Sequence, residues 1–542
     1  MSGLKSCRLR WVVCLLAIGC GGTFSFQRVS AGMFHEGGSH GTEPFGIRVL
    51  DAETGRGIPL VQLRTVNGIR FFSDSLGNIA FDEPDLMNRE IFFHVESHGY
   101  QFQKDGFGYR GVKLQTKPGA RALVKLKRLN LAERLYRITG SGIYRDSIRL
   151  GIRHPMAQPE LNAQVTGCDS VVNAVYRGKL YWFWGDTNRA GYPLGNFQVS
   201  GATSPLPSLG DPGLGIRLRY FENEKGFVRQ MAPVPGKGPT WIFGAFVIHS
   251  GGQESLLAKY EKIKPPMIPY ERGLVLYNDQ KQQFEKYREF PLDAPAYPDG
   301  QTLRWKTAAG EHLYFSTPFP HVRVAANLEA VKDPGQYESY TCLRSGVRLE
   351  HRNGKPVVTA DMLDRDTRGQ LRTGWKKNAP PITPSLEKQL LAQKLIRPHE
   401  SIALLQGKAF DKQEESIQLA SGSVAWNDYR KKFIMIAVQS WGSSLLGEIW
   451  YAESDRLEGP WKNVVKVVTH DQYSFYNPRH HPYFDRKDGR EIFFEGTYTK
   501  MFSETRVGTP RYDYNQIMYK LDLEKIAPRE IESELPETNP DR

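Results

Sequence analysis

Short apolar runs, each bounded by a turn, recur along most of the chain. The clearest is Gly178-Lys-Leu-Tyr-Trp-Phe-Trp-Gly-Asp-Thr187, with weaker copies at 272–277, 311–316, 430–438 and 489–494. Aromatic and β-branched residues in runs of this length are typical of buried strands. Most copies have a further apolar run on each side, as at 422–426 and 448–454 around the fourth copy. Repeated sets of three or four antiparallel strands predict a β-propeller, here with five blades, because a closed ring hides its strand edges.

Residues 44–128 show a different pattern and are expected to form a separate β domain. A strand, an Asp/Gly turn and a second strand occupy 47–63, and further strands are predicted at 73–81, 90–95 and 122–126. The order D-x-x-T-G, I-P, S-D-S-x-G resembles the carboxypeptidase regulatory-like, or transthyretin-like, β-sandwich. That resemblance implies a non-catalytic companion domain of a secreted protein. The predicted fold class is therefore all-β, with a sandwich followed by the propeller.

The remaining segments divide the chain further. Residues 129–160 are predicted to be a connector that contains a short helical stretch at 131–136, and the propeller is expected over 161–525. Charged turns interrupt it at 345–415, where Thr383 and Pro384 begin apolar positions at helical spacing up to residue 396. The polar, proline-bearing segment 528–542 is expected to be disordered.

The first 31 residues have the composition of an export signal. Lys5, Arg8 and Arg10 precede the apolar run 11–18, and small residues follow, with a plausible cleavage site after Ala31. The apolar run is too short for a stable membrane span, so we predict a signal peptide and a secreted or periplasmic protein without a transmembrane segment in the mature chain. Lipid attachment at Cys20 is the alternative, because residues 16–20 loosely resemble a lipobox.

Charge and cysteine content narrow the expected partners. The net charge is +13, and the export segment holds four Lys/Arg and no acid, which leaves +9 for the rest. No basic block or nucleic-acid motif accompanies this surplus, so no nucleic-acid partner is expected, whereas an acidic polysaccharide or an anionic cell surface fits. Only Cys168 and Cys342 lie beyond the export segment, and the sequence allows either one disulfide or two buried thiols.

A second resemblance concerns the propeller. The segment Ala452-Glu-Ser-Asp-Arg-Leu-Glu-Gly-Pro-Trp461 resembles the blade endings of five-bladed glycoside hydrolases that act on arabinan, xylan and fructan. Gly201-Ala-Thr-Ser204, at the end of the first blade, resembles these blade endings more weakly. The resemblance implies hydrolysis of a glycosidic bond in a polysaccharide or oligosaccharide by paired carboxyl groups. The alternative is a non-catalytic propeller that binds glycans or a cell surface, since a fold alone does not determine a function.

The candidate catalytic residues are Asp169, Asp186 and Glu495. The resemblance implies a base early in the innermost strand of blade one, and Asp169 fits that position, although an Asp there can also cap the strand entry. Asp186 ends the next strand, where the alternative is a turn-forming role. Glu495 lies among aromatic residues, so burial is expected to raise its pKa as a proton donor requires. A Glu paired with a basic side chain is the ordinary alternative.

The chain departs from the pattern of these hydrolases at blades two and three. Residues 238–246 contain no acid where the second carboxylate is expected, and Asp299 is the one acid at the start of blade three. Glu254, Glu338 and Glu448 remain as substitutes.

Substrate-binding positions are expected among aromatic and histidine residues at blade ends. These are Trp184, Trp441, Tyr476, His480, His481 and Tyr498. Adjacent histidines on a strand face opposite ways and no acidic ligand set accompanies them, so no metal site is predicted. Phosphate-loop, zinc and serine-nucleophile motifs are absent from the sequence, which leaves cofactor, linkage and oligomeric state open.

Overall fold

The computed structural model describes residues 43–527, except 157–159, 208–210, 353–354 and 409–413. The expected export signal with Cys20, and the tail at 528–542, lie outside the described residues. Strands dominate, and the helices include α1 (Arg145–Arg149), α2 (Leu328–Val331) and α3 (Pro384–Ala392). Short 3-10 helices occur at Pro84–Leu86, Asn162–Gln164, Pro334–Gln336, Ala360–Met362, Pro398–Glu400, Pro482–Phe484 and Leu523–Lys525. The all-β prediction, with a sandwich followed by a propeller, is confirmed.

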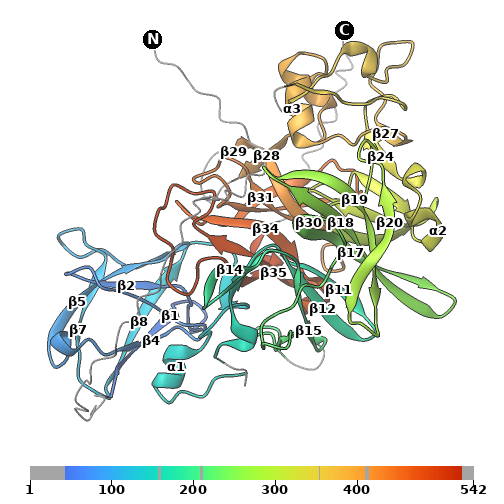
Figure 1. The fold of residues 1–542 in the computed structure, drawn as a ribbon. Coiled ribbons are helices and arrows are strands. Elements are labelled where there is room, and N and C mark those ends of the chain that lie inside the picture. Colours follow the sequence, from blue (N-terminus) through green and yellow to red (C-terminus); the bar gives the residue numbers. More distant parts are fainter. Residues whose placement is uncertain (1–42, 157–159, 208–210, 353–354, 409–413, 528–542) are drawn as a thin grey trace, which may run out of the picture.

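The N-terminal domain is a sandwich of two four-stranded sheets, drawn in blue at one side of Figure 1. One sheet contains β4 (Asn78–Phe81), β1 (Phe45–Asp51), β8 (Arg121–Arg128) and β6 (Tyr100–Gln101). The other contains β3 (Arg70–Phe72), β2 (Gln62–Thr65), β5 (Glu90–Glu96) and β7 (Gly111–Gln115). Strand β1 pairs in parallel with β8 and antiparallel with β4. An apolar core that includes Ile47, Val49 and Phe81 fills the space between the sheets.

Five sheets of four to six strands each follow the N-terminal domain in chain order. The first contains β11 (Val172–Tyr176), β12 (Lys179–Trp184), β15 (Ser200–Ser204) and β16 (Arg219–Tyr220), and the second contains β17 (Thr240–Ser250), β18 (Gln253–Lys264), β19 (Ile268–Asn278) and β20 (Gln283–Phe290). The third contains β21 (Gln301–Thr307), β22 (Gly310–Ser316), β23 (Val322–Ala325), β24 (Glu338–Thr341) and β27 (Gly374–Lys377). The fourth contains β30 (Leu419–Asn427), β31 (Lys432–Gln439), β32 (Ile449–Ser454), β33 (Lys462–Val468), β28 (Leu405–Lys408) and β29 (Glu414–Ile417). The fifth contains β34 (Ser474–His480), β35 (Glu491–Thr499), β36 (Asn515–Asp522) and β9 (Glu133–Arg137).

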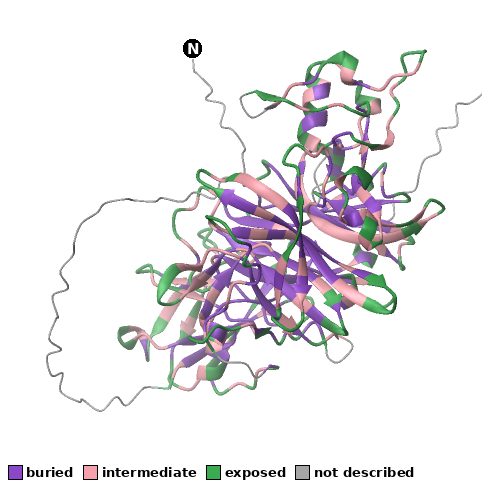
Figure 2. Cartoon of the chain, turned by 45° about the vertical axis from the view of Figure 1, so that its right-hand side comes forward, coloured by how far each residue is buried: buried purple, intermediate pink, exposed green. Residues whose placement is uncertain are grey.

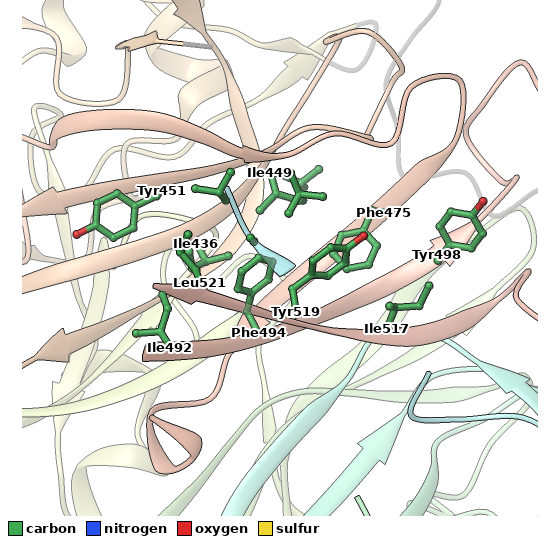
Figure 3. Packing of buried hydrophobic residues seen from close by; sticks show 14 of the residues in the cluster. Ile436, Ile449, Tyr451, Phe475, Ile492, Phe494, Tyr498, Ile517, Tyr519 and Leu521 are labelled. Atoms are coloured by element: carbon green, nitrogen blue, oxygen red, sulfur yellow. The ribbon is translucent and has the colours of Figure 1, made fainter. Parts of the chain in front are cut away.

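The first strands of successive sheets contact one another, as the blades of a propeller do. Strand β11 contacts β17, β17 contacts β21, β21 contacts β30, and β30 contacts β34. The ring closes between the fifth and first sheets, where Arg479 Nη2 donates to the carbonyl of Asn173 at 2.8 Å. Separate apolar clusters lie between neighbouring sheets, and Figure 3 shows the one that joins β31 and β32 to β34, β35 and β36. The strand interiors are buried on both faces, which explains the nearly continuous apolar runs such as 433–438 (Figure 2).

The predicted helical stretch at 131–136 is wrong. Residues Glu133–Arg137 form strand β9, which pairs antiparallel with β36 and completes the fifth sheet. All five residues are buried, and Glu133 forms an ion pair with Lys520 at 3.0 Å. Pairing with a strand almost 400 residues away overrides the local helical preference. The expected connector therefore contributes to the ring itself.

The segment at 345–415 also adds to the propeller. Its strand β27 extends the third sheet and β28 and β29 extend the fourth, while β25 (His351–Arg352) and β26 (Lys355–Pro356) form a separate hairpin. The predicted helix is confirmed as α3, with the Thr383 side chain accepting the backbone N–H of Leu386 as an N-cap. Figure 1 shows this segment projecting away from the ring.

Two further observations concern cysteines and membranes. Cys168 and Cys342 are buried free thiols, which decides between the two alternatives that the sequence allows. None of the helices in the described part of the chain has the length and apolar character needed to cross a bilayer.

Candidate functional site

Asp169 lies between β10 (Val165–Cys168) and β11, at the entry to the innermost strand of the first sheet. Strand β10 forms a small sheet with β13 (Thr187–Arg189) and β14 (Tyr192–Asn196). Asp169 is half-buried as a residue, and its Oδ2 accepts the Tyr476 hydroxyl at 2.7 Å. Burial raises the pKa of Asp169, and the Tyr476 hydrogen bond only partly opposes this rise. Its position matches the sequence expectation, but the structure alone assigns it no role.

Gly185 makes room for this carboxyl. A Cβ atom at position 185 would lie 2.2 Å from Asp169 Oδ1, and the Gly185 N–H donates to the Asp169 carbonyl at 2.8 Å. Any larger residue at position 185 would therefore displace the Asp169 side chain.

Asp186 lies directly behind Asp169, at the end of β12. The backbone N–H of Asp169 donates to the carbonyl of Asp186 at 3.4 Å, and Asp186 Oδ1 accepts the Trp241 indole N–H at 3.1 Å. The Asp186 side chain is buried, and both burial and the charge of Asp169 raise its pKa. When two carboxyl groups lie close together, the charge of one disfavours ionisation of the other. The pair therefore retains its last proton to a higher pH than an isolated carboxyl group does, and the two groups titrate together.

The entry ends of several innermost strands meet beside this pair. Asn477 Nδ2 donates to Ser170 Oγ at 2.8 Å, and Ser421 Oγ donates to Asn477 Oδ1 at 2.9 Å. From the third sheet, Gln301 Nε2 donates to the Val171 carbonyl at 3.3 Å. Residues from the first, third, fourth and fifth sheets thus converge here, and Ser170, Asn477, Ser421 and Gln301 are all partly exposed. The Asp169–Asp186 pair therefore lies at the centre of one end of the ring.

Glu495 lies elsewhere and is sealed from solvent. Its exposure is 0%, and its Oε1 is 2.8 Å from His481 Nε2. Asn173 Nδ2 donates to His481 Nδ1 at 3.2 Å, which leaves the hydrogen on Nε2 for donation to Glu495. Burial raises the pKa of Glu495 to about 8, as the sequence suggested. Because a fully buried carboxyl cannot reach a polymer, the expectation that Glu495 donates a proton to substrate is corrected.

Most of the aromatic and histidine residues expected to bind sugar are part of the core. Trp184 stacks on Trp182, and Tyr498 packs inside the cluster of Figure 3. Tyr476 is also buried and presents its hydroxyl to Asp169. In contrast, Trp441 is 57% exposed and follows β31 at the same end of the ring as Asp169. The stacking roles expected for Trp184, Tyr476 and Tyr498 are therefore corrected, and that of Trp441 stays a prediction.

His480 and His481 have different buried partners. His480 Nε2 lies 2.9 Å from Asp485 Oδ1, whereas His481 faces Glu495. Neither histidine is exposed to a ligand, so their expected role in sugar binding is corrected. Among the described residues, no cluster of three or more His, Cys, Asp or Glu side chains is arranged to hold a metal ion.

The substitute acids that the sequence left open have ordinary partners. Glu254 accepts the backbone N–H of Arg177 at 2.6 Å, Glu338 pairs with Arg323 at 2.7 Å, and Glu448 pairs with Lys466 at 2.9 Å. These contacts account for the three residues as structural groups.

Asp299 forms an ion pair that the sequence did not predict. Lys259 Nζ, which is buried, lies 3.1 Å from Asp299 Oδ1 and 3.0 Å from Glu261 Oε1. The rings of Phe243 and Tyr297 also face this ammonium group, at 4.7 and 4.6 Å from their centroids. Asp299 is thus the partner of a buried lysine, which suits a structural ion pair better than a proton donor. Lys259 lies within strand β18, and the residues around it in the sequence do not indicate a contact with Asp299.

Comparison with known proteins places the chain only loosely. No protein-family model matches it, and no curated protein matches it. Among solved structures, a provisionally named hydrolase from Bacteroides ovatus is similar with a TM-score of 0.41 and 13% identity, over 68% of this chain and 89% of that one. An exo-β-1,3-galactanase from Phanerochaete chrysosporium gives 0.33 and 10%, over 68% of this chain and 63% of its own length, which is less than two thirds. A xylotriose complex of a GH43_1 enzyme from Xanthomonas citri gives 0.30 and 9%, over 66% and 87%. Similarity at this level transfers neither an activity nor residue roles.

Proposed function

We propose that this chain is an exported glycoside hydrolase that cleaves a polysaccharide with the Asp169–Asp186 pair. The proposal is supported by one observation above the others: two adjacent carboxyl groups with raised pKa values lie where the innermost strands converge, and one of them is partly exposed. Active sites commonly hold carboxyl pairs whose environment keeps one protonated and the other ionised.

The two carboxyl groups would have different tasks. Asp169, which is the less buried of the two residues, removes a proton from the attacking water as its oxygen bonds to the anomeric carbon. The bond from that carbon to the departing sugar oxygen breaks, and this oxygen takes a proton from solvent; Asp186, which is buried, does not reach the substrate and instead sets the charge of Asp169 through its proximity. Release of the proton from Asp169 to solvent restores the starting state. Tyr476 orients Asp169, and Trp241 orients Asp186.

The second candidate function is a glycan-binding propeller without catalysis. It is favoured by the deep burial of Asp186 and by the absence of an acid at the start of β17. In this case Asp169 and Asp186 would brace the entry of the first sheet, and Trp441 would offer the exposed ring for sugar stacking.

Incubation of the purified protein with plant, algal and bacterial polysaccharides distinguishes the two. Hydrolysis releases new reducing ends from at least one polymer, and the rate falls when Asp186→Asn removes the proton-holding carboxyl. The Asp455→Asn variant is the matched control, because Asp455 is an exposed residue outside the site. Retention on a polymer without any released sugar would instead support the binding function.

A further inference from the structure

A second feature of the molecule is a cleft of about 290 Å³ between the sandwich and the propeller. Three parts of the chain that are distant in sequence line it. Arg70 comes from β3, Arg145 and Arg149 from α1, and Arg511 from the segment before β36. Ligand sites occur preferentially at domain interfaces, and this volume is near the lower end of the usual range.

The arginines of this cleft exceed the carboxylates available to them. Asp146 Oδ1 is shared by Arg145 at 2.9 Å and Arg511 at 3.8 Å, so one carboxylate faces two guanidinium groups. Arg149 forms an ion pair with Asp82. Within the described residues, Arg70 has no acidic partner at all. With Arg137 and Glu83 included, five arginines and four acids line the cleft, so its charge is positive by a small surplus.

One acid of the cleft, Asp74, contributes little to offset this charge. Asp74 Oδ1 accepts the backbone N–H groups of Leu76 and Asn78 at 3.0 and 3.1 Å, and Oδ2 accepts that of Ser147 at 2.7 Å. Burial raises the pKa of Asp74, which favours its neutral form. By contrast, the pKa of Arg511 is lowered by burial and by the nearby charges of Arg145 and Arg149, as expected where like charges meet.

The guanidinium groups remain accessible, and an apolar surface lies beside them. The side chains of Arg145 and Arg511 are 39% and 42% exposed. Phe71 and Phe72 line the same cleft and are only partly buried. Guanidinium forks next to aromatic rings suit a sugar that carries a planar or tetrahedral anionic substituent, because the fork binds the oxygens and the ring faces the sugar.

We propose that this cleft is a non-catalytic binding site for an acidic polysaccharide, whose sulfate or carboxylate groups bind the exposed guanidinium N–H groups of Arg145 and Arg511 that Asp146 does not occupy. Arg70 contributes a further positive charge at the rim. Neither Asp169 nor Asp186 lines this cleft, so the proposal does not depend on hydrolysis and survives if the chain has no enzymatic activity.

Affinity electrophoresis of the purified full-length protein in gels containing dextran sulfate, polygalacturonate or neutral dextran tests this site. We expect at least one anionic polymer to retard the protein and neutral dextran not to retard it. Comparison of the retardation by dextran sulfate with that by polygalacturonate shows whether the site prefers sulfate or carboxylate groups. The double variant Arg145→Gln/Arg511→Gln should weaken the apparent affinity at least about tenfold, as expected for loss of charge-assisted hydrogen bonds. Arg352→Gln/Arg368→Gln, which removes two exposed arginines outside the cleft, should change it less than about twofold.

The proposal is overturned if neither anionic polymer retards the wild-type protein, or if both double variants lose affinity equally. The latter result would show that net charge alone governs binding. Because Arg145 also pairs with Asp146, the folded state of its variant is verified by its melting temperature. Arg70→Gln, which removes an exposed side chain without an ion pair, gives an independent test and should by itself weaken binding.

Discussion

Replacement of Glu495 by Gln tests the reasoning about buried charge in the ring. The Glu495 carboxyl has 0% exposure, its Oε2 has no hydrogen-bond partner, and burial raises its pKa from 4.5 to about 8. Gln is neutral at every pH and nearly identical in shape, and its Oε1 can still accept the His481 Nε2–H. The substitution therefore removes a titration and little else.

The sign and size of the effect follow from proton linkage. Since the folded pKa lies above the unfolded value, the folded state holds a proton that the unfolded chain has lost, so this contribution to stability is complete below about pH 4.5 and is lost as the pH rises through about 8. At 1.36 kcal/mol per pKa unit, the loss amounts to at most about 5 kcal/mol. Glu495→Gln has no carboxyl group to ionise and therefore does not lose this free energy, so its stability relative to the wild type should increase with pH.

Melting temperatures measured in steps between about pH 5 and about pH 9 provide the assay. The difference between Glu495→Gln and wild type should grow by several degrees over this range, since about 1 kcal/mol shifts the melting temperature of a large domain by a few degrees. Glu524→Gln, which changes an exposed carboxylate, should give a constant difference. A constant difference for Glu495→Gln as well would mean that Glu495 is ionised in the folded protein, which would contradict the raised pKa.

Three further predictions follow from packing. Gly185→Ala should lower sugar release at least about tenfold without unfolding the protein, because its Cβ would displace Asp169; unchanged activity would contradict this role. Cys168 and Cys342 should react with a thiol reagent only after denaturation, and a disulfide detected by mass spectrometry would refute their assignment as free thiols. Trp184→Ala should cost roughly 3–5 kcal/mol of stability, seen as a large fall in melting temperature; a loss of sugar binding with an unchanged melting temperature would restore the stacking role.

The sequence was most informative where a pattern is local. The apolar run at 433–438 is continuous because both faces of β31 are buried, and the cap and proline before α3 specify where that helix begins. Strand β9 could not be predicted from a local pattern, because its partner β36 lies at the other end of the chain and local propensity favours a helix. Pairing across such a distance leaves no periodic signal near residue 133.

The candidate site was predictable only in part, for a related reason. Asp169 could be placed because it precedes an innermost strand, and its position there did not depend on side-chain direction. Glu495 shows the opposite case: its aromatic neighbours correctly indicated a raised pKa, yet the same neighbours enclose it completely. A sequence shows that an acid lies among apolar residues, but it does not show whether the strand face opens to solvent or to the next blade.

The most direct test of the proposed function is the rate of sugar release by Asp169→Asn, measured with a polymer that the wild-type protein cleaves. Asn preserves the acceptor for the Tyr476 hydroxyl but cannot take a proton from water. We expect the rate to fall by about 100-fold or more. The melting temperature should stay nearly unchanged, because burial disfavours the charge of Asp169 and Asn carries none. Wild-type rates in the Asn variant, or a protein that melts much earlier, would show that Asp169 braces the strand entry and does not take part in catalysis.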